Sequence, residues 1–169
     1  MFSDWIARVM IRDIDSVRDQ LNAYTDETDI WRLVPGIANS AGTLALHLAG
    51  NVQYYIGAHL GATGYVRDRE AEFTARDVPR SELLAQIEAA RTALMKTLPA
   101  LDAGALDSVY PTEVAGLRPS VGQFLVHLAT HLAYHLGQID YHRRTVTANG
   151  AIRGMQSIPA LIAPVNSEK

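Results

Sequence analysis

The sequence predicts an all-α protein, a four-helix bundle with a C-terminal extension. Four stretches, at about residues 3–24, 40–60, 81–98 and 120–147, repeat their apolar residues at spacings of three and four, which is the period of an amphipathic helix. Connections rich in glycine, proline and polar residues separate these stretches. Cysteine is absent, which excludes disulfides, thiolate metal sites and a cysteine nucleophile. Helix packing alone is therefore expected to hold the fold together.

The first predicted helix, about residues 3–24, has one apolar face, and Ser3 is placed to serve as its N-cap. That face consists of Trp5, Ile6, Val9, Met10, Ile14, Val17 and Leu21. The connection over residues 25–39 contains two turn-rich patches, so no long helix is expected there. Trp31 and Leu33 are the residues expected to anchor this connection on the core.

The second predicted helix, about residues 40–60, has polar side chains on its apolar face. Ser40 is a suitable N-cap. His47 and Asn51 follow the same helical period as the apolar residues Leu44, Leu48 and Tyr55. Polar residues in this position suggest that another polar group faces them in the fold. His59 lies about 120° around the helix from His47, so it is expected to face solvent or the helix end.

A dense charged segment over residues 67–73, Arg-Asp-Arg-Glu-Ala-Glu-Phe, precedes the third predicted helix at about residues 81–98. One interpretation is a solvated loop with local ion pairs. The other is a rim that recognises anions, in which Arg67 or Arg69 meets a substrate carboxylate. The sequence leaves both open.

The last predicted helix, about residues 120–147, begins at Pro119-Ser120 and stops at Asn149-Gly150. The tail over residues 150–169 shows no strong period and forms the C-terminal extension. There is no internal repeat, low-complexity tract or sign of a second domain. One domain is therefore expected over residues 1–169, a length that can bury a substantial core.

Histidines line one face of the last predicted helix. At 100° per residue, His127, His135 and His142 all lie within about 40° of His131, and Gln138 lies among them. Two histidines one helical turn apart can direct their rings at one point, which suits a metal ion. Taken singly, His142 has the simpler interpretation of a packed histidine with satisfied hydrogen bonds.

His47 of the second helix, with His131 and His135 of the last, is the candidate ligand set for one divalent metal ion. Three protein ligands leave a coordination position open for water or substrate, as in catalytic sites. Gln138 and Asn51 lie on the same faces and can orient ligands or substrate from outside the ligand set. His127 is either a ligand in place of His135 or a residue located above the site.

Charge and motifs exclude several classes of function. The formal net charge is −3, from 15 basic and 18 acidic residues, so nucleic acid is not an expected partner. The first residues carry charges and no apolar signal core, and no apolar run is long enough for a membrane span. We therefore expect a cytoplasmic protein. Metalloprotease, di-iron, P-loop, dinucleotide and nucleophile-elbow motifs are all absent.

The chain resembles the DinB/YfiT-like superfamily of bacterial metal-binding four-helix bundles over about residues 5–148. The resemblance rests on the segment 39–51, which contains His47, and on His131-Leu-Ala-Tyr-His135-Leu-Gly137-Gln138-Ile139. It implies that His47, His131 and His135 bind one divalent ion, most often zinc or nickel. It also favours His127 as a neighbour of the site, and it implies a homodimer.

Three kinds of function are open, namely two enzymatic ones that the resemblance implies and one without activity. The favoured one is an enzyme that transfers an external low-molecular-weight thiol to a small electrophile. The second is a metal-dependent hydrolase that uses metal-bound water, which ester or amide substrates tested without thiol would distinguish. The third is a metal-binding bundle without activity, which a fourth protein ligand such as His127 would favour. A small-molecule substrate is the expected partner for either enzyme.

Overall fold

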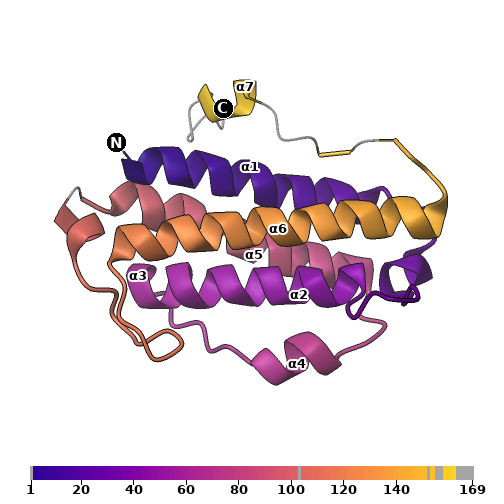
Figure 1. Ribbon diagram of the computed structural model, residues 1–169, viewed down its shortest axis with the longest axis horizontal. Coiled ribbons are helices and arrows are strands. Elements are labelled where there is room, and N and C mark those ends of the chain that lie inside the picture. Colours follow the sequence, from indigo (N-terminus) through magenta and orange to yellow (C-terminus); the bar gives the residue numbers. More distant parts are fainter. Residues whose placement is uncertain (1, 103, 152, 155–157, 163–169) are drawn as a thin grey trace.

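The computed structural model describes residues 2–102, 104–151, 153–154 and 158–162. Its long helices are α1 (Phe2–Asn22), α2 (Ala41–Val52), α5 (Arg80–Thr97) and α6 (Val121–Thr147). In Figure 1, α1 and α2 lie on opposite sides, and each packs on both α5 and α6. The predicted all-α class and the four-helix bundle are confirmed.

The long helices begin where side chains satisfy their free backbone N–H groups. The hydroxyl of Ser40 accepts a hydrogen bond from the backbone N–H of Thr43 at the start of α2. Ser120 and Gln123 form a reciprocal capping box at the start of α6. The prediction for Ser3 is wrong, because α1 already begins at Phe2 and Ser3 is a buried residue inside it.

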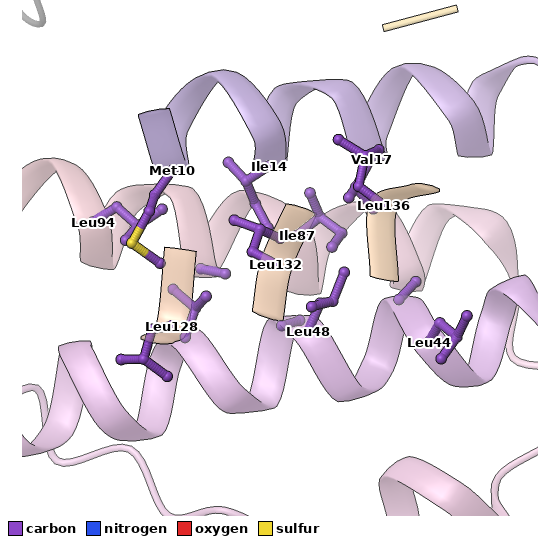
Figure 2. Close-up of a cluster of buried hydrophobic side chains, with 14 of the residues drawn as sticks. Met10, Ile14, Val17, Leu44, Leu48, Ile87, Leu94, Leu128, Leu132 and Leu136 are labelled. Carbon is purple, nitrogen blue, oxygen red and sulfur yellow. The ribbon is translucent and has the colours of Figure 1, made fainter. Parts of the chain in front are cut away.

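The core fills the space between the four helices, and most residues of the predicted apolar faces supply it; Trp5 is the exception, because it is 65% exposed. Figure 2 shows this buried cluster, and the leucines of α6 lie between residues of α1 and α2. The residues labelled there are all buried: Met10, Ile14, Val17, Leu44, Leu48, Ile87, Leu94, Leu128, Leu132 and Leu136. Leu128, Leu132 and Leu136 of α6 thus face the core, while His131 and His135 lie against His47 of α2.

The second predicted helix is not one regular α-helix. After α2, residues Gln53–Ala58 form a π-helical turn, η2, which leads into the short α3 (His59–Gly61). This end of the helix packs closely on α5. A Cβ atom on Gly57 would lie 3.2 Å from Cβ of Ala93, and one on Gly61 would overlap the side chain of Thr97. The close approach to α5 explains why glycine stands at positions 57 and 61.

The connection between α1 and α2 contains the 3₁₀ helix η1 (Glu27–Trp31), capped by the side chain of Asp26. Trp31 is buried as predicted, and its indole N–H donates to the backbone carbonyl of Val78 over 3.1 Å. Leu33 is 57% exposed, so the prediction that it anchors the connection is wrong. Trp31 alone fills the space beside Gly42 of α2, where its ring lies against the helix backbone.

Part of the charged segment is helical. Residues Arg69–Thr74 form α4, with Asp68 as N-cap, and α4 packs on the outer side of α2 (Figure 1). Glu72 in this helix is buried. The interpretation of the segment as a solvated loop is therefore wrong for its second half, because a buried carboxylate needs partners inside the protein.

The remaining elements are short. The turns η3 (Leu98–Ala100) and η4 (Gly104–Asp107) connect α5 to the segment before α6. In the predicted tail, Pro159–Ile162 form α7, which lies against α1. Residues 152, 155–157 and 163–169 of that tail are outside the described residues. A single domain over residues 1–169 stays a prediction.

Among the described residues, no helix has the length and apolar character needed to cross a membrane.

Candidate metal centre

Three imidazoles from two helices meet at one point. His47 comes from the middle of α2, and His131 and His135 come from successive turns of α6. Nε2 of His131 lies 3.3 Å from Nε2 of His47 and 3.1 Å from Nε2 of His135. One ligand atom from each residue lies within 4.8 Å of the others, so this group can hold a metal ion. The fold thus brings together all three candidate ligands.

The spacing of the nitrogens fits a divalent ion. Zinc binds imidazole nitrogen at about 2.0–2.1 Å, and tetrahedral geometry then separates two ligand nitrogens by about 3.4 Å. The separations of 3.3 and 3.1 Å from His131 are close to this value. A small shift of the side chains would open the group to tetrahedral geometry.

The proton count of the cluster also fits a cation. Nδ1 of His47 lies 3.0 Å from a carboxylate oxygen of Glu72, and Nδ1 of His135 lies 2.6 Å from the amide oxygen of Gln138. Both oxygens only accept hydrogen bonds, so each Nδ1 carries the proton and each Nε2 presents a lone pair. His131 has at most one proton to share between these two lone pairs. A metal ion can accept all three Nε2 lone pairs at once.

The environment favours the neutral form of His131 and His135, the form that binds metal. Burial lowers the pKa of His131 to about 4, and the neighbouring His135 and His47 add to this effect. Burial also lowers the pKa of His135, although its hydrogen bond with Gln138 acts in the opposite direction. Nδ1 of His131 is buried and has no hydrogen-bond partner among the described residues.

Glu72 is the residue at this site that the sequence analysis missed. Burial alone would raise the pKa of this carboxyl, but hydrogen bonds from His47 and Arg67 outweigh it and hold the pKa below its usual value. The Arg67 guanidinium binds both carboxylate oxygens, Nε to Oε1 at 2.6 Å and Nη2 to Oε2 at 2.7 Å. No spacing rule connects His47 to Glu72, which follows 25 residues later, so the sequence carried no signal for this contact.

The two arginines of the charged segment have different surroundings. Arg67 is engaged by Glu72, so it is not free to bind a substrate carboxylate. Arg69 is exposed, and its guanidinium carbon lies 5.1 Å from the ring centre of Phe73. The Phe73 ring lies in turn 5.0 Å from the His47 ring. Of the two proposed anion-binding residues, only Arg69 keeps its charge available near the site.

The other histidines lie outside the three-histidine group. His127 is exposed, and its ring stacks between Phe124 and His131 at centroid distances of 5.8 and 6.0 Å. This agrees with the expectation that it lies next to the site. His142 is buried, with Nδ1 2.7 Å from the Tyr24 hydroxyl and Nε2 2.7 Å from the Arg32 carbonyl. His142 is therefore a packed histidine with both nitrogens satisfied.

His59 and Asn51 complete the comparison with the sequence. His59 begins the short α3 at the end of the second predicted helix, where it is half-buried between the rings of Tyr54 and Tyr110. Asn51 is buried one helical turn after His47. Gln138 has the supporting contact that was expected of it, through His135. Among the described residues, no hydrogen bond connects Asn51 to a histidine.

A cavity of about 290 Å³ lies one helical turn from two of the candidate ligands. Leu44 of α2 and Gln138 of α6 both line it, and they follow the same helices as His47 and His135. The full lining is Gly36, Ile37, Ala38, Asn39, Leu44, Gln138, Tyr141 and His142. The three candidate ligands do not line this cavity themselves, and its mostly apolar lining suits a small molecule with an apolar body.

The fold and this site define a class, an all-α bundle protein with a three-histidine group that can hold a metal ion. Comparison with known proteins then gives the family. The profile of a family described as "Protein of unknown function (DUF1572)" matches residues 4–159, so the chain belongs to this family. No curated protein matches the chain. No solved structure matches it either.

Proposed function

We propose that His47, His131 and His135 bind one divalent metal ion, zinc or nickel, and that the protein is a metal-dependent enzyme acting on a small molecule. The favoured reaction is transfer of a low-molecular-weight thiol to an electrophile. Membership of the DinB/YfiT-like superfamily and a homodimeric state, both implied by the resemblance, are part of this proposal.

The observation that carries the proposal is the convergence of three Nε2 atoms, from His47, His131 and His135. Among the described residues, these three alone form the group that could hold the ion. Nδ1 of His47 and Nδ1 of His135 are engaged by Glu72 and Gln138, which leaves Nε2 as their free donor atom. His127 does not belong to the group, and neither does any other described acidic residue or histidine. Three ligands without a fourth favour an open, reactive site over a closed structural one.

A divalent ion in such a site acts as a Lewis acid that makes a coordinated thiol or water more acidic near neutral pH. The chain contains no cysteine, so a thiol must come from outside. Leu44 and Gln138 line a cavity of about 290 Å³, and each lies one helical turn from a candidate ligand. The presence of this cavity supports a small organic molecule as the substrate. The same space also supports the second candidate, hydrolysis of a small ester or amide.

Metal analysis is the first test. Untagged protein is purified without added metal, and its metal content is measured by inductively coupled plasma mass spectrometry. We expect about one ion per chain in the wild type, as for a mononuclear site. His47→Ala should lose this ion, whereas the control His59→Ala should keep it. Absence of metal, with none taken up on titration with zinc or nickel, would remove the proposal.

The second test separates the two reactions. Metal-loaded protein is mixed with a small thiol and 1-chloro-2,4-dinitrobenzene, so that a carbon–sulfur bond forms while chloride and a proton are released. A parallel assay uses 4-nitrophenyl acetate without thiol. A thiol-dependent rate that is lost in His47→Ala supports the transferase. Ester cleavage without thiol that is lost in the same variant supports the hydrolase, and metal binding without either rate favours a protein with no such activity.

A further inference from the structure

We propose that Glu72, held in place by Arg67, is a positioning residue that orients His47 for the metal ion and is itself kept out of the ligand set. The inference rests on the proposed metal site and assigns to α4 and the segment before it a role in setting metal affinity. It concerns three side chains that form one chain of contacts from the surface of the bundle to the candidate ligands.

The first contact fixes the His47 ring. Its Nδ1 lies 3.0 Å from Oε2 of Glu72, and the two side chains are only 9% and 6% exposed. A carboxylate that accepts the Nδ1 proton selects the tautomer whose Nε2 lone pair is free, and it makes that nitrogen a stronger donor. Histidines that bind metals usually have such a partner on their second nitrogen.

The second contact fixes the carboxylate. Arg67 binds Glu72 through two nitrogens, and both side chains are buried, at 8% and 6% exposed. Nη2 of Arg67 also lies 3.3 Å from Nδ1 of His47. Both of these nitrogens are donors, so they do not hydrogen-bond to each other. Each donates to the same carboxylate oxygen, Oε2 of Glu72. Both oxygens of Glu72 thus accept hydrogen bonds from Arg67, and Oε2 also accepts from His47, while Glu72 does not belong to the three-histidine group.

The third contact fixes the arginine. The π-helical turn η2 supplies Tyr54 and Tyr55, whose ring centres lie 5.9 and 5.6 Å from the guanidinium carbon of Arg67. Arginine stacks favourably on aromatic faces at such distances. π-helical turns are rare and often occur at functional sites. Here the turn places two consecutive tyrosines on the same arginine.

The helix itself leaves room for this arrangement. Gly50 lies three residues after His47 on α2, and a Cβ atom there would overlap Oε1 of Glu72. Any larger residue would push the carboxylate away from His47. Glu72 thus approaches α2 at a glycine, where the helix backbone allows close contact.

The three candidate ligands consequently differ in the hydrogen-bond partner of Nδ1. His47 has a carboxylate, His135 has the neutral amide of Gln138, and Nδ1 of His131 has no partner among the described residues. His47 is therefore expected to be the strongest donor of the three. Removing the Glu72 charge should weaken metal binding more than any change to another acidic residue of α4.

The test measures the zinc dissociation constant by competition with a chelator. Loss of such an outer partner typically weakens metal binding about 10- to 100-fold, and we expect this for Glu72→Gln. Glu70→Gln makes the same change at an exposed position of α4 and should bind zinc as the wild type does. Gly50→Ala keeps the charge but displaces the carboxylate, and it should weaken binding as Glu72→Gln does.

A spectroscopic readout separates positioning from a general loss of structure. In the cobalt(II)-loaded protein, the visible absorption bands report on the imidazole ligands. We expect these bands to shift in Glu72→Gln and Gly50→Ala and to stay unchanged in Glu70→Gln. If Glu72→Gln does not fold because the Arg67 charge is left buried and unpaired, the double variant Arg67→Met/Glu72→Gln removes both charges and should show the same weak binding and shifted bands.

The outcomes distinguish this inference from the proposed function. If the wild type binds zinc and the folded Glu72 and Gly50 variants bind it equally well, the positioning role is wrong and the metal site stands. If the wild type binds neither zinc nor nickel, both proposals fall together. Weak binding that is confined to the Glu72 and Gly50 variants supports the inference.

Discussion

His131 lies between the other two imidazoles, with its Nε2 3.3 Å from Nε2 of His47 and 3.1 Å from Nε2 of His135. Replacing it should therefore disrupt the whole group. We expect His131→Ala to lose nearly all bound metal, because the two remaining imidazoles make a poor site for a single ion. Mass spectrometric metal analysis of the purified variant measures this directly.

His127 provides the matched control on the same helix. It is one turn before His131, and its exposed ring stacks on the His131 ring without joining the group. His127→Ala should retain metal at the wild-type level. Equal metal loss in both variants would show that His127 is a ligand and would contradict our assignment.

At the scale of elements, two glycines have opposite surroundings. A Cβ atom on Gly42 of α2 would lie 2.6 Å from the nearest ring atom of Trp31, whereas one on Gly137 of α6 would meet nothing within 4 Å. We expect Gly42→Ala to lower the free energy of unfolding by about 1–3 kcal/mol, the usual cost of overpacking. Gly137→Ala should raise it by about 0.5–1 kcal/mol, because alanine is the better helix former.

Chemical denaturation of both variants measures these changes. The comparison is informative because the chemical change is identical and only the packing differs. If Gly42→Ala were as stable as Gly137→Ala, η1 would not be packed on α2 as the structure has it.

At the scale of the whole molecule, the metal site connects two helices that are far apart in the sequence. An ion held by α2 and α6 binds the folded chain and not the separated helices, so it should stabilise the fold. At a free metal concentration of 100 times Kd, the gain is about 2.7 kcal/mol, and a protein of this size should show a Tm higher by about 5–10 °C.

Thermal unfolding with and without zinc measures this gain. The reference is His131→Ala, the variant that is expected not to bind the metal. The added stability should disappear in the variant and should grow with zinc concentration in the wild type. A zinc-independent Tm in wild-type protein that does contain the ion would contradict the bridging role.

The metal-stripped protein should lose stability in mild acid. Burial lowers the pKa of His131 to about 4, below the value of about 6.5 in an unfolded chain. The unfolded state then binds more protons between these pH values, so stability is fully present above pH about 6.5 and declines as pH falls toward 4. The pKa values of His135 and His142 are shifted in the same direction.

Urea unfolding of the stripped protein at pH 7 and at pH 5 tests this expectation. The free energy of unfolding should be lower at pH 5, and His131→Asn should show a smaller difference between the two conditions. A stability that is unchanged or higher at pH 5 would show that these histidines are not held neutral in the fold.

The sequence by itself determined the helices and three of the residues that meet at the site. Periodic apolar residues placed both ends of α1, α5 and α6 and the start of α2 to within two residues, whereas α2 ends at Val52 and not near residue 60. His47, His131 and His135 could be selected because positions one turn apart share a helix face whatever the rest of the fold does. The capping residues Ser40 and Ser120 were likewise readable from local chemistry.

Only the tertiary structure decided which residues support those histidines. Glu72 reaches His47 from α4, a short helix whose position depends on packing against α2 and on the space above Gly50. The π-helical turn and the exposed position of Leu33 were equally invisible in the sequence. The physical reason is that the periodicity of a sequence determines which side chains share one face of a helix. Contacts between a connection and a helix depend instead on how neighbouring elements pack in space.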